Sequence, residues 1–100
     1  MAHRLRGLPT TDVCGRRVPV AATRAARLLG LALLDREAAG SGLLIPCCRC
    51  VHTFGMRFPL TLVFLDEAVR MVSVRDRVPP RRLAFEWRAR AVLELPGGAR

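Results

Sequence analysis

The clearest hydrophobic pattern in the sequence is the run of residues 60–65. Alternate residues of a strand point to opposite faces of a sheet. Here both alternating sets are mainly apolar: Leu60, Leu62 and Phe64 on one side, Thr61, Val63 and Leu65 on the other. The run therefore predicts a central strand covered on both faces. We expect the chain to be organised around residues 42–66, which hold this strand and three of the four cysteines.

Shorter patterns predict further extended segments on both sides of this run. They cover residues 43–45, ended by Pro46; 49–54, with a bend at Gly55 before extension resumes at 56–58; 69–75; and 90–95. Residues 12–20 predict a hairpin turning at Gly15-Arg16, at a sheet edge because Pro19 cannot donate to a ladder. Residues 78–82 contain two prolines, so we expect a break there, followed by a loop carrying Phe85 and Trp87.

One segment has the period of a helix instead of a strand. Its apolar residues recur at helical spacing, at Ala25, Leu28, Leu29, Ala32 and Leu33. Thr23 is suited to cap the amino end. The pattern predicts one covering helix over about residues 24–34. Gly30 inside it indicates close packing against the sheet, because glycine disfavours a helix interior.

Together these elements predict a mainly β fold, a small antiparallel barrel or jelly-roll-like sandwich with the one covering helix. The length of 100 residues fits a single domain, 1–100. Within it, residues 1–11 carry no strong pattern, and we expect them to form a flexible N-terminal tail.

The charge of +9 changes this picture little. All seventeen basic residues are arginine, and they are scattered from Arg4 to Arg100 in no run longer than a pair. We therefore interpret them as a basic solvated surface and do not expect a nucleic-acid partner. The amino end, residues 1–15, contains no apolar segment of the length that a secretion signal needs, and no stretch of the sequence approaches the length of a membrane span. We therefore expect a cytoplasmic protein with reduced cysteines, monomeric or a small homo-oligomer.

Several blocks of the sequence resemble a known family. They are residues 42–46, 51–59, 63–66 and 91–95, with Cys48-Arg49 and Val78-Pro79-Pro80 between them. This pattern resembles domain of unknown function family 192 over roughly residues 18–98. The resemblance implies a mainly β barrel or jelly roll with a short helix, found in bacteria and archaea, without an established activity. Thr61 stands where many members have Asp, and Cys47 and Cys50 where Pro and Ser are more usual.

The cysteines raise two chemical alternatives. In an extended strand Cys48, Cys50 and His52 lie on one face, where thiolates and imidazole could bind zinc, although the spacing is not that of a standard zinc site. His52 could instead activate Cys48 or Cys50 as a nucleophile, but no third group to orient the imidazole is visible. We expect reduced structural cysteines, no cofactor and no catalytic residue.

The preferred hypothesis is a binding or accessory module rather than an enzyme. The candidate ligand-binding residues are His52, Phe54, Met56, Arg57 and Glu94. The segment 52–57 combines a titratable group, an aromatic ring, a soft apolar group and a cation, which suits a small anionic or carbonyl-bearing ligand or a protein partner. Glu94 lies between two leucines and faces away from them.

Two further alternatives stay open. A nucleic-acid-binding domain would align Arg49, Arg57, Arg70, Arg75 and Arg90 on one continuous face. An assembly subunit would expose an apolar patch around Leu31, Leu34 or Trp87.

Overall fold

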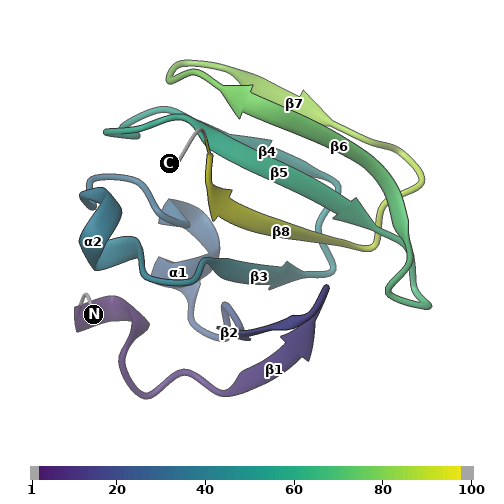
Figure 1. The fold of residues 1–100 in the computed structure, drawn as a ribbon, viewed down its shortest axis with the longest axis horizontal. Coiled ribbons are helices and arrows are strands. Elements are labelled where there is room, and N and C mark those ends of the chain that lie inside the picture. The colour runs from purple at the N-terminus through teal and green to yellow at the C-terminus, as the bar shows by residue number, and fades with distance from the viewer. Residues whose placement is uncertain (1–2, 98–100) are drawn as a thin grey trace.

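A computed structural model describes residues 3–97 (Figure 1). Three short helices and eight strands follow one another in the order η1 His3–Leu5, β1 Thr10–Val13, β2 Arg16–Pro19, α1 Arg24–Leu29, α2 Arg36–Ala39, β3 Leu43–Pro46, β4 Cys50–His52, β5 Leu60–Leu65, β6 Met71–Val78, β7 Leu83–Phe85 and β8 Ala91–Pro96. The strands form a four-stranded sheet, β3-β8-β5-β6, and two pairs, β1-β2 and β4-β7. All paired strands within these sheets are antiparallel.

Strand β5 lies in the middle of the four-stranded sheet, as its apolar alternation predicted. Val63 pairs with Leu93 of β8 on one side and with Val74 of β6 on the other. Leu60, Leu62 and Phe64 belong to the larger core, whereas Val63 and Leu65 belong to a second one. The strand is therefore buried on both faces.

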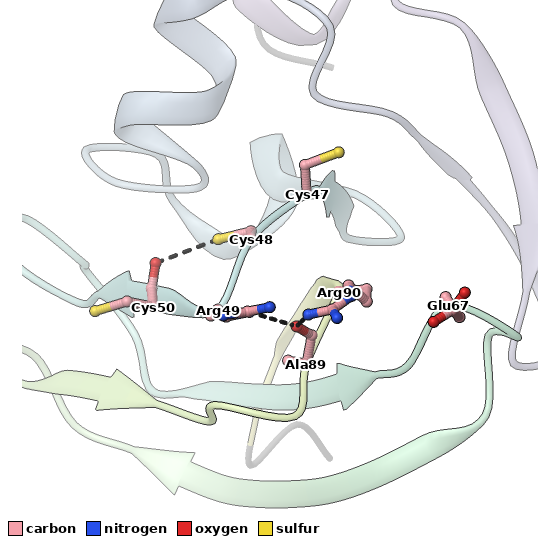
Figure 2. Close-up of a pocket in the computed structure, with 7 residues that line it drawn as sticks. All are labelled: Cys47, Cys48, Arg49, Cys50, Glu67, Ala89 and Arg90. Atoms are coloured by element: carbon pink, nitrogen blue, oxygen red, sulfur yellow. Dashed lines mark hydrogen bonds between the residues drawn. The ribbon is translucent and has the colours of Figure 1, made fainter.

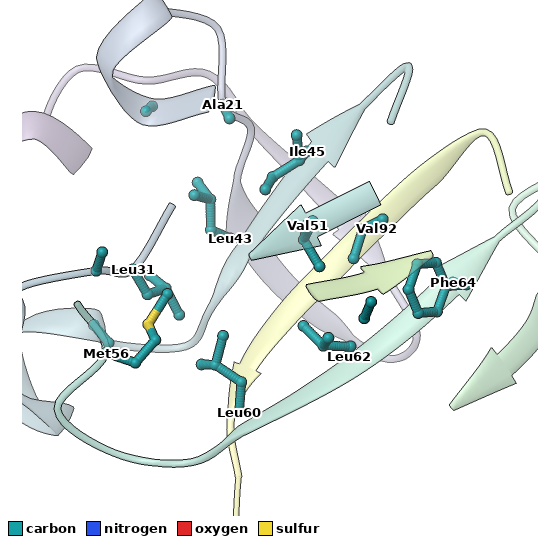
Figure 3. Packing of buried hydrophobic residues seen from close by; sticks show 14 of the residues in the cluster. Ala21, Leu31, Leu43, Ile45, Val51, Met56, Leu60, Leu62, Phe64 and Val92 are labelled. Atoms are coloured by element: carbon teal, nitrogen blue, oxygen red, sulfur yellow. The ribbon is translucent and has the colours of Figure 1, made fainter. Parts of the chain in front are cut away.

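The two cores lie on opposite faces of this sheet. The larger one joins the sheet to the helical region and to β4 through side chains such as Leu31, Leu43, Val51 and Leu62 (Figure 3). The second is covered by the β1-β2 hairpin, which contributes Val13 and Val18. Burying two sets of apolar side chains on one strand explains why residues 60–65 carry the strongest pattern in the sequence.

The predicted amino-terminal hairpin is present, but it turns at Cys14-Gly15 and not at Gly15-Arg16. Both turn residues have positive φ, 51° for Cys14 and 76° for Gly15. A two-residue hairpin turn of this kind needs positive φ at both positions, which places glycine second. A parallel bridge between Val20 and Leu44 connects the end of the hairpin to β3.

The single helix predicted over 24–34 is wrong in its length. Thr23 does cap α1, accepting a hydrogen bond from the Ala26 amide at 3.1 Å, but the helix ends at Leu29 and a separate turn forms α2. At Gly30 the chain has φ 55°, ψ −126°, which is not helical. The buried residue of α1 is Ala26, while Leu28 of the predicted stripe is 71% exposed.

Two other details differ from the sequence prediction. Residues 56–58 do not resume a strand, and the predicted loop that carries Phe85 contains strand β7, which pairs with β4. The mainly β, antiparallel part of the fold prediction is confirmed. Within residues 3–97 the three sheets do not join into a closed barrel, so the barrel or jelly-roll detail is not.

The amino-terminal segment for which a flexible tail was expected contains regular structure from His3 onward. Leu5 of η1 is 1% exposed and belongs to the larger core, and residues 10–11 open β1. Residues 1–2 of that segment lie outside the described residues. Among residues 3–97, no helix is long and apolar enough to cross a membrane.

Candidate functional site

A small pocket opens between the carboxyl end of α1, strand β4 and strand β8. Its volume is about 180 Å³. Its lining combines apolar side chains such as Leu29, Ile45 and Val51 with Glu94 and several further titratable residues. The apolar part of this lining disfavours the ionised form of a carboxyl group placed beside it.

Glu94 is held in this pocket with one oxygen bonded. Its side chain points to the larger core from the middle of β8 and is 2% exposed. Oε1 accepts a hydrogen bond from the Leu31 amide at 3.2 Å. Within residues 3–97, Oε2 accepts no hydrogen bond from the protein. Burial raises the pKa of Glu94 to about 7, against the opposing pull of the Arg4 guanidinium and the Leu31 amide.

Gly30 explains why α1 ends beside this carboxyl group. A Cβ at position 30 would lie 2.5 Å from Glu94 Oε1, closer than real Cβ contacts come. The positive φ of Gly30 turns the backbone so that the next amide, that of Leu31, reaches the carboxylate. The sequence prediction that Gly30 permits close packing on the sheet is thus explained by one side chain, Glu94.

His52 forms another wall and joins two elements. Its Nε2 lies 2.9 Å from the Leu28 carbonyl oxygen, which accepts, and its Nδ1 accepts from the Phe54 amide at 3.2 Å. These roles place the proton on Nε2 of a neutral ring. Both nitrogens are occupied by backbone groups, so His52 fastens β4 to the end of α1 and is not available to activate a thiol.

The mouth of the pocket is lined by thiols and arginines. Cys48 and Cys50 line both the pocket and an adjoining shallower depression of about 440 Å³, which also includes Arg24 and Arg27. The Arg27 guanidinium donates to the Pro46 carbonyl oxygen at 2.6 Å, which fixes it near the end of β3. Burial raises the pKa of the Cys48 thiol, so this thiol is a weak nucleophile.

The predicted ligand-binding residues do not all converge. His52 and Glu94 line the same pocket. Phe54 is 51% exposed, with its ring centroid 6.1 Å from that of His52, and Met56 is buried in the larger core. Arg57 is exposed and lines a separate hollow. The turn at residues 54–55 separates these side chains, because it ends the strand register on which the prediction relied.

The cysteine segment does not assemble a metal site. Among residues 3–97, no three His, Cys, Asp or Glu side chains are placed to hold a metal ion together. The Cys48 thiol donates to the Cys50 carbonyl oxygen at 3.2 Å, and the thiols of Cys47 and Cys48 point away from each other (Figure 2). These cysteines line one side of an open hollow of about 860 Å³ that also contacts Arg49 and Arg90.

The pocket residues that the sequence did not indicate come from the helix end. Arg27, Leu28 and Leu29 were placed on a longer covering helix, and nothing in that pattern indicated that a pocket would open where the helix ends. The available signal was Gly30, whose position in an otherwise helical pattern marks a close approach of backbone to another group.

Fold and site together define a mainly β protein with a buried carboxyl group facing a small, largely apolar pocket. Residues 9–100 match the family DUF192, described as Uncharacterized ACR, and the chain belongs to this family, as its sequence pattern predicted. A crystal structure of a protein of unknown function from Novosphingobium aromaticivorans is similar in fold, with a TM-score of 0.71 at 20% identity. The match covers 98% of this chain and 81% of that one. No curated protein matches the chain.

Proposed function

We propose that the protein binds a small polar ligand in the pocket of Glu94 and His52. One observation carries the proposal: Glu94 is 2% exposed, yet it lines an open pocket and one of its oxygens has no hydrogen bond from residues 3–97. Within residues 3–97, Oε2 is not among the fully buried side-chain atoms that lack a hydrogen-bond partner, so it reaches the open pocket. A ligand that donates a hydrogen bond to Oε2 there would gain about 0.5–3 kcal/mol, most when the carboxyl group is ionised.

The size of the pocket limits the group that enters it. Pockets for drug-sized ligands span about 300–1,000 Å³, whereas this one holds about 180 Å³. Only a few non-hydrogen atoms fit inside, and the rest of a larger molecule would lie in the adjoining depression beside Arg24 and Arg27. The proposed ligand therefore has a hydroxyl or amino group that meets Glu94 and an anionic group near the arginines.

This proposal keeps the binding role expected from the sequence but moves its centre. Glu94 and His52 remain, whereas the anionic part of the ligand meets Arg24 and Arg27 in place of Arg57. No catalytic step is proposed, because His52 is held by two backbone groups and the Cys48 thiol has a raised pKa.

The proposal is tested by titrating the isotope-labelled protein with glycolate, lactate and glycine, and with acetate as a ligand without the donor group. We expect glycolate or glycine to shift the backbone amide signals of Gly30, Leu31 and His52 saturably, and acetate to shift them less. In the Glu94→Gln variant these shifts become weaker. The matched control is Glu37→Gln, because Glu37 is exposed on α2.

Two results would contradict the proposal. In one, none of the probes shifts the Gly30 and Leu31 signals at high millimolar concentration. In the other, acetate and glycolate act alike and Glu94→Gln changes neither response.

A further inference from the structure

A second hollow, separate from the Glu94 pocket, gathers three arginines. It has a volume of about 660 Å³ and lies where the turn after β4 meets the segment before β7. Arg57, Arg81 and Arg82 line it together with apolar groups such as Leu33 and Pro80, and no carboxylate is among the lining residues. The hollow is suited to anions, because its cations converge without a local counter-charge.

Next to this hollow, the β4-β7 pair presents apolar side chains to solvent. His52 pairs with Leu83 and Cys50 with Phe85, while the alternate pair, Val51 and Ala84, is buried. Leu83 and Phe85 therefore point outward, and they are 72% and 57% exposed. Trp87, two residues further along, is 68% exposed, and Phe54 at the end of β4 is 51% exposed.

Three of the five aromatic residues are thus exposed, and all three belong to this pair of strands or its ends: Phe54, Phe85 and Trp87. Aromatic side chains bury large apolar areas and dominate cores and interfaces. Exposing several of them beside an arginine hollow is costly without a partner. We call this region the aromatic-arginine face; it consists of Phe54, Leu83, Phe85 and Trp87 with Arg57, Arg81 and Arg82.

We propose that the aromatic-arginine face binds single-stranded nucleic acid, with phosphates in the arginine hollow and bases stacked on Phe85 and Trp87. Leu83 and Phe85 are same-face positions of β7, about 6.5–7 Å apart, and Trp87 follows in the turn directly after the strand, so successive bases of an extended single strand can meet apolar side chains one after another. Flat sheets that carry exposed aromatics are one way in which proteins read unpaired bases. The proposal goes beyond the ligand pocket and does not depend on it.

The charge around the face favours a polyanion. Glu86 is the acidic residue between Phe85 and Trp87, and it is already paired with Arg75 at 3.8 Å and Arg88 at 3.3 Å. The sequence argued against nucleic acid because its arginines are scattered. The fold brings Arg57 to Arg81 and Arg82 from 24 or more positions away, and the whole chain carries +9.

An anionic membrane surface is the competing partner, because exposed tryptophan, leucine and arginine also occur at lipid interfaces. The observations favour nucleic acid over it. Leu83 and Phe85 lie on one face of the β4-β7 pair, and a hollow lined by three cations beside it suits a phosphodiester strand better than a planar bilayer.

Trp87 makes the test direct, because it is the single tryptophan of the chain. The purified protein is titrated at low salt with short single-stranded RNA and DNA oligonucleotides of mixed sequence, with a DNA duplex, and with vesicles containing anionic lipid. We expect the single strands to quench Trp87 emission through stacking, with little response to the duplex. The RNA and DNA arms show which strand is preferred.

Variants then separate stacking from charge, with affinities measured by anisotropy of a labelled oligonucleotide. Phe85→Ala should weaken binding about five- to 150-fold, the range found when one stacking side chain is removed. Met71→Ala, a 64% exposed residue of β6, is the matched control. Log affinity falls as log salt concentration rises, and Arg82→Ala should make this negative slope less steep by about 0.7. Arg16→Ala on β2 should leave it unchanged.

The proposal is overturned if the single strands leave Trp87 emission unchanged at low salt, or if Phe85→Ala and Met71→Ala bind equally well. It is also overturned if vesicles shift the emission to shorter wavelength while oligonucleotides have no effect, which would assign the face to a membrane. Thermal unfolding of each variant shows that a loss of binding is not a loss of fold.

Discussion

Glu94 places an ionisable group where the neutral form is preferred. Its pKa is raised from the ordinary 4.5 to about 7, chiefly because burial penalises the carboxylate. Between these values the folded protein keeps a proton that the unfolded chain has released. The free energy of unfolding should therefore fall as the pH rises through this window. The stabilising effect is complete below about pH 4.5 and lost above about pH 7.

The first prediction concerns this pH dependence. Raising the pH from 5 to 8 should cost the wild type about 2.5 kcal/mol through Glu94 alone, and Glu94→Gln should remove that contribution, because an amide cannot ionise. Both proteins keep the other charged or titratable groups around the pocket, which are Arg4, Arg27, Cys48, Cys50 and His52. Urea unfolding of both proteins under reducing conditions measures the difference. An identical pH slope in the two would show that Glu94 does not titrate in this range.

The second prediction uses two glycines with nearly the same backbone. Gly30 and Gly40 each end a short helix, with φ of 55° and 63° and ψ of −126° and −133°. Alanine at either position should cost about 1–3 kcal/mol of backbone strain. Gly30→Ala should cost about 1–3 kcal/mol more from overpacking, because its Cβ would meet Glu94 Oε1, whereas nothing lies within 4 Å of a Cβ at position 40. Denaturant unfolding compares them, and equal losses would contradict the proposed contact.

At the level of single residues, the sequence identified two pocket residues, His52 and Glu94. It did not predict that His52 joins β4 to α1 or that Glu94 is buried against the end of α1. Glu94 looked like an outward strand residue because neither neighbour reveals which face of β8 meets the helix region. Met56 was placed in the site because it follows His52 closely. Whether Met56 points to solvent depends on the turn at Gly55, whose carbonyl oxygen accepts a hydrogen bond from the Leu33 amide at 2.7 Å.

Among the helices and strands, the sequence prediction was correct where a local hydrophobic pattern was sufficient to define the element. Strand β5 and its hairpin with β6 follow from local alternation and a turn at Asp66, whose carboxylate accepts from the Ala68 and Arg70 amides at 2.9 Å. The end of α1 could not be predicted in the same way. It depends on a contact between Leu31 and Glu94, 63 residues apart. Strand β7 was missed because two prolines precede it and its partner, β4, is distant in sequence.

The third prediction concerns the joint between β4 and β7. Thr53 is fully buried; its Oγ1 donates to the Pro79 carbonyl oxygen at 2.7 Å and accepts from the Arg82 amide at 2.8 Å. Thr53→Val keeps the shape and leaves both backbone groups unpaired, so it should lower the free energy of unfolding by about 2–4 kcal/mol. Thr10→Val, at an exposed position of β1, should change it little. If Thr53→Val and Thr10→Val lower the free energy of unfolding equally in denaturant, the Thr53 hydroxyl does not hold this joint together.

For the molecule as a whole, composition and hydrophobic pattern predicted a mainly β fold, but they could not show how its sheets join. Closure depends on how separate sheets meet, and here β4 and β7 pair with each other instead of extending the four-stranded sheet. Charge was equally hard to place, because only the fold shows which arginines converge. The nucleic-acid alternative required Arg49, Arg70 and Arg75 on one face, but their guanidinium groups are paired with the Ala89 carbonyl oxygen, Asp66 and Glu86, respectively.

The fourth prediction tests how far the amino-terminal segment belongs to this assembly. Leu5 is 1% exposed in the larger core, so Leu5→Ala should lower the free energy of unfolding by about 2–4 kcal/mol. Arg6→Ala, at an exposed neighbour, should be nearly neutral. Thermal or denaturant unfolding decides between a docked segment and a tail. If both variants unfold like the wild type, the segment contributes nothing to stability.

The position of β8 also determines when this fold can form during synthesis. Strands β3 and β5 both pair with β8, the last to be made of the eight strands that the structure describes, and the β1-β2 hairpin covers a core that includes Leu93 of β8. While a nascent chain emerges from the ribosome, the apolar sides of β3 and β5 therefore lack their partner until residue 96 is free. Long-range pairing of this kind slows folding and leaves apolar strand surface exposed until β8 has been made.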